Sequence, residues 1–387
     1  MKKKIAILGS TGSIGKTLIN IIKKDKKNFE IILLSADENY KELLKQARLF
    51  RVKNLIITNK NSYKKIKEKK VSEKIRIFNN FESFKKIFKK KIHYTMSSIS
   101  GIEGLKPTIE MIKYTKNIAI ANKEAIICGW NLINKELKKN NTTFIPIDSE
   151  HFSIWYALKG IDKKIIDKIY LTASGGPFLN YPKKKFNKIK MRHAVSHPNW
   201  KMGKKISIDS ATMMNKVFEI IEAKKIFNIP YKKLSIIIHP RSYVHAILKF
   251  KNGLTKLVVH DTNMKIPIFN SLYSSNQTIK SKELDLKTLN NLDFQGIDLK
   301  RFPTLKILSN LPEKSSLFET IIVSINDKLV KLFLSERIKF TDISKKMNSM
   351  LKLNDFKKFK KFKVKKVDDI MKLNNVVEVK LNKMINR

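Results

Sequence analysis

The chain has 387 residues, a formal net charge of +48 and a single cysteine, Cys128. This length exceeds one ordinary hydrophobic core, so two or three domains are expected. No apolar run approaches the roughly 18 residues of a membrane span, and Ile5 to Leu8 is too short for a signal-peptide core. One cysteine excludes an intramolecular disulfide and is typical of a reducing compartment, so we expect a cytoplasmic protein without a membrane partner.

The positive charge could indicate a polyanion-binding surface, and that alternative stays open at this point. Most of the charge is lysine spread along the whole length, together with many isoleucines and asparagines. An AT-rich coding genome imposes this composition on any protein, and no single basic patch stands out. The pattern favours compositional bias, and we expect no nucleic-acid partner.

Residues 1–149 alternate short apolar runs with lysine-rich helical stretches. This alternation predicts an α/β fold, a Rossmann-like doubly wound parallel sheet that binds a dinucleotide. The expected strands are Ile5–Leu8, Ile31–Leu34, Asn54–Thr58, Tyr94–Ser97, Ile118–Ala121 and Phe144–Ile147.

Residues 150–265 change to a mixed pattern, for which we predict a central α+β catalytic domain. Lys251-Asn252-Gly253 separates two strand-like runs and indicates a hairpin. Residues 266–295 have weak periodicity and are predicted to be a linker. Residues 296–387 contain no glycine after Gly296 and are expected to form a C-terminal helical bundle. The strands expected in the central domain are Ile169–Thr172, Leu234–His239, Ala246–Phe250 and Thr255–Val259.

The first strand leads directly into the glycine turn Gly9-Ser-Thr-Gly-Ser-Ile-Gly15, and a helical stretch follows. Such glycines let the backbone approach a pyrophosphate, whose charge then sits at the helix N-terminus. Strand, turn and helix stand in the order that a dinucleotide site requires, although a plain tight turn is the alternative. At the end of the second strand, Asp37 and Glu38 favour the free ribose of NADH over the 2′-phosphate of NADPH.

Two acids follow the last strand of the first domain. If Asp148 and Glu150 continue the extended backbone, they point to the same side and can converge. A third carboxylate, Glu219, is expected on a helix that begins near Asp209 and Ser210. Three carboxylates without a His/Cys cluster favour Mg²⁺ or Mn²⁺, whereas capping acids in a surface loop are the alternative.

The same helix would place Asn215 and Glu219 on one face, with Lys216 beside them. The turn Ala173-Ser-Gly-Gly-Pro177 offers backbone N–H groups and a hydroxyl. With Ser174 and Ser210, this set suits one phosphate monoester. Residues 174–204 could form a lid loop that includes His197, Trp200 and Met202.

Six ordered motifs carry a family resemblance along essentially the full chain. They are Gly9-Ser-Thr-Gly-Ser-Ile-Gly15, Ala121-Asn-Lys-Glu124, Asp148-Ser-Glu-His151, Ser174-Gly-Gly-Pro-Phe178, His197-Pro-Asn-Trp-Lys-Met-Gly203 and Asp209-Ser-Ala-Thr-Met-Met-Asn-Lys216. Together they closely resemble 1-deoxy-D-xylulose 5-phosphate reductoisomerase, the family that serves the methylerythritol phosphate route to isoprenoids. The resemblance implies a homodimeric, NADPH-dependent enzyme with a phosphosugar substrate and a bound Mg²⁺ or Mn²⁺.

The resemblance also implies a role for individual positions. The metal ligands would be Asp148, Glu150 and Glu219, which with Lys123 and His197 form the expected catalytic set. Substrate contacts would come from Ser149, Glu150, Ser174, His197, Trp200, Met202, Ser210, Asn215, Lys216 and Glu219. Cofactor contacts would come from Thr11, Gly12, Ser13, Ile14, Asn39, Asn122, Lys123, Glu124 and Gly203.

Two segments depart from the family pattern. Asp37-Glu38 stands where the family commonly has glycine followed by lysine or arginine, so NADH becomes possible in place of NADPH. Val259-His-Asp-Thr-Asn-Met264 stands where the family usually has Leu-Gly-x-Pro-Asp-Met, in a region that resembles the subunit contact. The first departure bears on cofactor choice and the second on dimer geometry.

The sequence therefore predicts isomerisation of 1-deoxy-D-xylulose 5-phosphate by a retro-aldol/aldol sequence, followed by reduction to 2-C-methyl-D-erythritol 4-phosphate. Another Rossmann oxidoreductase that needs no metal is the alternative. It would explain the glycine turn but not the carboxylate and phosphate sets. A polyanion-binding protein is the more remote alternative and would explain only the charge.

Overall fold

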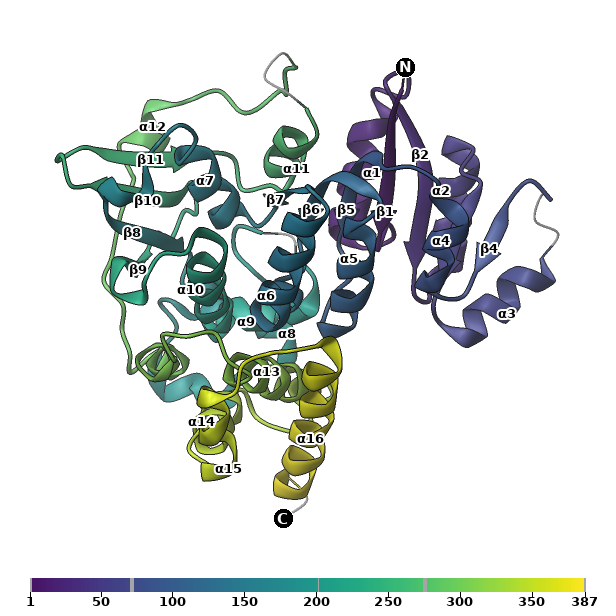
Figure 1. Cartoon of the computed structure of the whole chain (residues 1–387). Helices are drawn as coiled ribbons and strands as arrows, with labels where there is room; N and C mark the ends of the chain where they lie inside the picture. The colour runs from purple at the N-terminus through teal and green to yellow at the C-terminus, as the bar shows by residue number, and fades with distance from the viewer. Residues whose placement is uncertain (1, 70–72, 201, 274–276, 386–387) are drawn as a thin grey trace. The chain divides into compact units, whose positions relative to one another are not determined.

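The computed structural model describes residues 2–69, 73–200, 202–273 and 277–385 (Figure 1). The chain forms two compact units. The first unit comprises residues 1–125, 131–148 and 264–279, and the second comprises residues 126–130, 149–263 and 280–387.

The first unit is built on a seven-stranded sheet with the order β4-β3-β2-β1-β5-β6-β7, drawn in purple and blue in Figure 1. Every neighbouring pair is parallel. Its strands are β1 (Lys3–Leu8), β2 (Phe29–Ala36), β3 (Asn54–Ile57), β4 (Arg76–Phe78), β5 (Ile92–Ser97), β6 (Thr115–Ile120) and β7 (Thr143–Pro146). Helices of this unit are α1 (Ser13–Lys23), α2 (Tyr40–Phe50), α3 (Lys60–Glu68), α4 (Phe84–Ile87), α5 (Leu105–Ile112), α6 (Lys123–Lys139, shared with the second unit) and α11 (Lys265–Leu272).

This sheet confirms the predicted Rossmann-like fold. All six expected strands are present, and β4 is an additional short strand at the sheet edge. The strand order reverses direction between β1 and β5, whose carboxyl ends flank the crevice where open α/β sheets bind ligands. The topology therefore puts the glycine turn after β1 at this switch point.

The second unit contains a four-stranded sheet with the order β11-β10-β8-β9. Strands β8 and β9 are parallel, whereas β10 runs antiparallel to both β8 and β11. The strands are β8 (Ile166–Ala173), β9 (Leu234–Ile238), β10 (Val244–Phe250) and β11 (Thr255–Val259). Gly253 has φ +86° in the β10–β11 turn, so the predicted hairpin is confirmed.

Helices make up the rest of the second unit, and the C-terminal region is helical, as predicted. Helix α13 packs against α9, α14 and α16, and α10 packs against α7 and α9. The helices are α7 (Ser149–Ala157), α8 (Met191–Ala194), α9 (Lys204–Ala211), α10 (Met214–Phe227), α12 (Leu286–Leu289), α13 (Phe318–Leu334), α14 (Phe340–Leu351), α15 (Asn354–Lys357) and α16 (Val367–Ile385). Among the short 3-10 helices, two belong to the first unit, η1 (Phe81–Ser83) and η2 (Ile102–Gly104), and the others belong to the second: η3 (Lys163–Ile165), η4 (Gly176–Phe178), η5 (Lys183–Lys188), η6 (Tyr231–Lys233), η7 (Pro303–Asn310) and η8 (Lys358–Lys361).

Residues 266–295 are not a plain linker. The segment begins inside α11, which packs against α1 and buries Ile268 and Leu272. Residues 264–279 accordingly belong to the first unit, and the segment from 280 onward belongs to the second. Residues 296–387 do not separate from the central region either, because α13 packs against α9. Within the described residues, no helix combines the length and apolar character needed to cross a membrane.

Candidate active site

Three carboxylates converge where β7 leads into α7. Asp148 immediately precedes α7 at the end of the first unit, Glu150 lies in the first turn of α7, and Glu219 lies on α10. One oxygen from each lies within 4.8 Å of the other two, and Glu219 is fully buried. Such an all-oxygen set suits a hard divalent cation.

The two neighbouring acids converge for a different reason than the one predicted. Strand β7 ends at Pro146 and α7 begins at Ser149, so Glu150 is helical instead of extended. The Ser149 hydroxyl donates a hydrogen bond of 2.6 Å to Glu150 Oε2. A helix N-terminus also favours negative charge, so the first turn of α7 suits a carboxylate beside Asp148.

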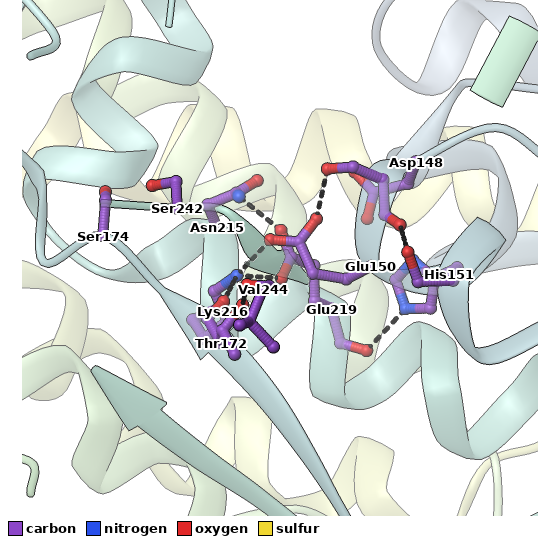
Figure 2. Close-up of polar contacts among 12 residues, drawn as sticks. Asp148, Glu150, His151, Thr172, Ser174, Asn215, Lys216, Glu219, Ser242 and Val244 are labelled. Atoms are coloured by element: carbon purple, nitrogen blue, oxygen red, sulfur yellow. Dashed lines mark hydrogen bonds and ion pairs between the residues drawn. The ribbon is translucent and has the colours of Figure 1, made fainter. Parts of the chain in front are cut away.

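Lys216 lies beside two of these carboxylates, those of Glu150 and Glu219 (Figure 2). Its ammonium forms an ion pair of 2.7 Å with Glu150 and a second ion pair with Glu219, and it donates a 2.5 Å hydrogen bond to the carbonyl of Thr172. Burial on its own would lower the pKa of Lys216, but the Glu150 and Glu219 carboxylates outweigh it and raise the pKa. The lysine therefore stays charged and offsets the clustered negative charge.

Helix α10 presents the predicted face but begins later than expected. Met213 adopts the left-handed conformation with φ +63° and separates α9 from α10. Asp209 and Ser210 therefore lie in the last turn of α9. Asn215 and Glu219 do share one face, and the Asn215 amide donates a hydrogen bond to Glu219.

The glycine turn after β8 lies against the end of α9. Gly176 has φ +64°, and a Cβ there would approach the Ser210 carbonyl oxygen to 3.0 Å. This close approach brings the turn that carries Ser174 next to Ser210. Larger side chains at residue 176 would separate the two hydroxyl-bearing segments.

His197 contacts Ser174 with a defined tautomer. Its Nδ1 accepts hydrogen bonds from the backbone N–H groups of Asn199 (3.1 Å) and Trp200 (3.0 Å). The proton therefore resides on Nε2, which lies 3.0 Å from the Ser174 hydroxyl and donates to it. Burial, followed by the nearby charge of Lys216, lowers the pKa of His197 to about 4. The imidazole is neutral at neutral pH.

Residues 197–203, here called the flap segment, are attached through Asn199 to the connection between β9 and β10. Its amide donates to the Pro240 carbonyl (2.5 Å) and contacts the Ser242 hydroxyl (3.1 Å). Trp200 and Met202 are both half-buried, and Lys201 falls outside the described residues. Gly203 is exposed and directly precedes α9. Its contact with the cofactor stays a prediction.

The glycine turn after β1 leaves no room for larger residues. A Cβ on Gly15 would lie 2.5 Å from the Gly9 carbonyl oxygen, and Gly9 itself has φ +80°. Gly12 precedes α1, and Gly12 and Ser13 are exposed while Thr11 and Ile14 are half-exposed. The turn therefore presents the first turn of α1 as a cradle for a phosphate.

Strand β6 leads to the Asn122-Lys123-Glu124 motif. Asn122 is buried, caps α6 by accepting a 2.7 Å hydrogen bond from Ala125 N–H, and donates to the Ile99 and Gly101 carbonyls. Its side chain thus shapes the loop after β5. Lys123 forms an ion pair with Asp148, and Glu124 is buried in the first turn of α6.

The predicted ribose selector lies at the end of β2. Asp37, Glu38 and Asn39 are all exposed. Asp37 accepts a 2.7 Å hydrogen bond from the Thr58 hydroxyl, and Asn39 caps α2 by accepting from Glu42 N–H at 3.1 Å. The Asp37 carboxylate therefore has a partner on the neighbouring strand connection.

Three groups of the cluster are absent from the predicted set. Thr172 supplies a carbonyl to Lys216, His151 contacts the Glu219 carbonyl through Nε2 at 2.9 Å, and Ser242 contacts Asn199. Figure 2 draws Ser174 and Ser242 on one side of Lys216 and His151 on the other. A backbone carbonyl carries no signal in the side-chain pattern, so Thr172 could not be found from the sequence. The Asp-Ser-Glu-His motif does include His151 and could have indicated it.

Comparisons with known proteins agree along the whole chain. The protein-family model of 1-deoxy-D-xylulose 5-phosphate reductoisomerase matches residues 5–129. Two family models of the C-terminal domains of that enzyme match residues 144–227 and 260–379. The 1-deoxy-D-xylulose 5-phosphate reductoisomerase of Pelagibacter ubique (strain HTCC1062) is 60% identical over 385 residues, which is 99% of both chains. The chain belongs to the 1-deoxy-D-xylulose 5-phosphate reductoisomerase family.

Further relatives and solved structures support this membership. The reductoisomerase of Wolbachia pipientis wMel is 40% identical over 90% of both chains. A reductoisomerase crystal structure in complex with NADPH, fosmidomycin and magnesium is 31% identical, with a TM-score of 0.90 over 99% of this chain and 98% of that one. The Zymomonas mobilis reductoisomerase in complex with NADPH has a TM-score of 0.88 at 28% identity over 100% and 99% of the two chains.

Proposed function

We propose that this chain converts 1-deoxy-D-xylulose 5-phosphate into 2-C-methyl-D-erythritol 4-phosphate, by a metal-dependent rearrangement and an NADPH-dependent reduction. The observation that carries the proposal is the cluster of Asp148, Glu150 and Glu219, in a chain that is 60% identical to a reductoisomerase over 99% of its length. A metal-independent Rossmann oxidoreductase has no use for this cluster.

The donor set fits Mg²⁺ or Mn²⁺. All three ligands are carboxylate oxygens, and no sulfur ligand belongs to the group. When bound, the divalent ion supplies Lewis-acid stabilisation of the charge that develops on the substrate's oxygens during the rearrangement. Asp148, Glu150 and Glu219 would hold it, and the Lys123 ammonium would orient Asp148.

The substrate phosphate is assigned to Ser174, Ser210, Asn215 and Lys216. Ser174 accepts from His197 and from Gly176 N–H (3.1 Å), so its own hydroxyl hydrogen remains available to donate to a phosphate oxygen. The phosphate does not react, yet its binding energy can hold the substrate fragments in place and close the flap segment. Trp200 and Met202 would cover the substrate and exclude water.

The nucleotide is assigned to the crevice beside β1. A Cβ at Gly9 or Gly15 would collide with backbone atoms, so glycine is needed at both positions for this tight turn. The turn in its present form leads into the N-terminus of α1, which favours a pyrophosphate. NADPH supplies the hydride for the reduction step. The hydrogen bond from Thr58 to Asp37 favours NADPH, since it draws one selector carboxylate toward β3, whereas the exposed Glu38 still favours NADH.

We further propose a cytoplasmic homodimer. Strand β11 is an edge of its sheet and exposes Leu257 (44%) and Val259 (37%), and Leu254 (65%) lies in the adjacent turn. A second copy of the chain would cover this apolar edge. The buried single cysteine suits the reducing cytoplasm.

One assay tests the function. The oxidation of NADPH and of NADH is followed with 1-deoxy-D-xylulose 5-phosphate, after chelation and after addition of Mg²⁺ or Mn²⁺, and the product is identified by NMR. We expect oxidation only when both substrate and metal are present. Oxidation that persists in chelator would support the metal-independent alternative, and no oxidation with either nucleotide would overturn the proposal. An NADPH preference above ~100-fold in kcat/KM would mean that Asp37 and Glu38 do not face the ribose.

A further inference from the structure

Two buried histidines stack on each other at the edge of the four-stranded sheet. His245 lies on β10 and His260 directly follows β11, and their ring centroids are 3.7 Å apart with an interplanar angle of 18°. His245 is 2% exposed and His260 is 8% exposed. Neither ring belongs to the predicted catalytic or binding set.

A strand irregularity explains why the two rings meet. The pairing of β10 with β11 shifts register between Val244 and Ala246, so His245 is the extra residue of a bulge. Bulges redirect a side chain out of the regular alternation of a strand. His245 Nε2 contacts the His260 carbonyl at 3.1 Å, which fixes the proton on Nε2 and completes the link between the two residues.

The ring of His260 combines its stack on His245 with one hydrogen bond. Its Nδ1 donates to the carbonyl of the next residue, Asp261, at 2.8 Å. Its Nε2 is buried and has no hydrogen-bond partner within the described residues. The Nδ1 bond reaches only the adjacent residue, whereas the stack on His245 joins the His260 ring to β10.

The stack continues to the flap segment. The Trp200 ring meets the His245 ring edge to face, with centroids 6.0 Å apart and an angle of 71°. We propose that His260 is a positioning residue that holds His245 in the orientation on which Trp200 rests. This role rests on the proposed function, which assigns Trp200 to the cover over the substrate.

Three variants separate stacking from other effects. His260→Ala removes the ring, and His260→Phe keeps a flat ring without nitrogens. The Asp261 carbonyl would still accept from Asn263 N–H at 2.7 Å in both variants. Phe356→Ala, in the C-terminal helices, is the control for a loss of stability away from the sheet, since Phe356 is 1% exposed.

The experiment uses full-length protein labelled with 5-fluorotryptophan and observed by ¹⁹F NMR. The chain has three tryptophans, so Trp200→Phe assigns the Trp200 signal. We expect His260→Ala to shift and broaden that signal, His260→Phe to keep the wild-type position more closely, and Phe356→Ala to leave it unchanged. A wild-type Trp200 signal in His260→Ala would overturn the proposal.

Turnover gives a second readout. We expect His260→Ala to lower kcat/KM roughly 10-fold, the scale of outer-shell changes, and His260→Phe to restore most of it. Equal losses in both variants would contradict a stacking role. The Trp200 signal can be measured whether or not the protein is active. A protein without reductoisomerase activity would overturn the proposed function, and the contact between Trp200 and His245 could still be tested.

Discussion

Glu219 belongs to the carboxylate cluster and also contacts two residues assigned to the phosphate site. It contributes to the carboxylate cluster, pairs with Lys216 and accepts a hydrogen bond from Asn215, while remaining fully buried. Removing its charge would leave Lys216 with one carboxylate partner fewer and the proposed metal with one ligand fewer. The proposed metal and phosphate sites would therefore be coupled through this residue.

We expect Glu219→Gln to lower activity at least ~100-fold, because even outer-shell changes at metal sites reach that scale. The measurement is kcat against Mn²⁺ concentration. Glu222→Gln is a matched control on the same helix, since Glu222 is also buried and pairs with His151 at 3.9 Å but is not one of the three clustered carboxylates. A Glu219→Gln enzyme with more than half the wild-type rate would disprove its assignment as a ligand.

His245 makes stability depend on pH. Burial, followed by the neighbouring His260, lowers its pKa from 6.5 to about 3. The folded state therefore binds fewer protons than the unfolded state below pH 6.5, and the free energy of unfolding falls as the pH drops through this window. Urea unfolding at pH 7.5 and pH 5.0 measures the loss. His245→Phe should show a smaller loss, and an unchanged one would contradict the assignment.

Among the elements, α9 connects the C-terminal helices to the site. Asp209 on α9 accepts a 2.7 Å hydrogen bond from Asn326 on α13 and pairs with Lys205, which also pairs with Asp327 at 3.0 Å. Ser210 follows Asp209 directly. The orientation of one phosphate-site hydroxyl thus depends on a helix more than a hundred residues later in the sequence.

Asn326→Ala should lower the free energy of unfolding by about 1–3 kcal/mol, because it removes a donor from a buried carboxylate. It should also raise KM for the phosphosugar through Ser210. Ser324→Ala is the control on the same helix, since its buried hydroxyl has no hydrogen-bond partner within the described residues. Equal stability of the two variants would show that the Asn326–Asp209 bond contributes little.

For the whole molecule, the proposed dimer uses the exposed edge of β11 as the contact between two copies. Leu257 and Val259 are two residues apart and lie on one face of the strand. Leu257→Glu would put a charge into the contact between two copies, which strongly weakens association.

We expect Leu257→Glu to shift the protein from dimer to monomer in sedimentation-equilibrium experiments. Val379→Glu on α16, where Val379 is 56% exposed, is the control and should leave the mass unchanged. A wild-type protein that is monomeric at micromolar concentration would contradict the dimer itself. If the Leu257→Glu variant stayed dimeric, the contact between the two copies would not lie at the edge of β11.

Sequence periodicity predicted most elements because burial on both faces makes parallel strands continuous apolar runs. It missed β4, which has three residues and no fully buried side chain. It also missed α11, whose buried face is short and interrupted by Pro267 and polar residues. The start of α10 was misplaced because a methionine in a left-handed conformation gives no sequence signal.

The sequence by itself determined the family, the glycine turns and the acidic residues, because these depend on residue type and on spacing along the chain. Only the tertiary structure decided that Lys216 bridges Glu150 and Glu219, that Asn326 reaches Asp209 and that His260 stacks on His245. Each of these contacts joins separate elements of the fold. Their geometry follows from how helices and strands pack, which local periodicity does not encode.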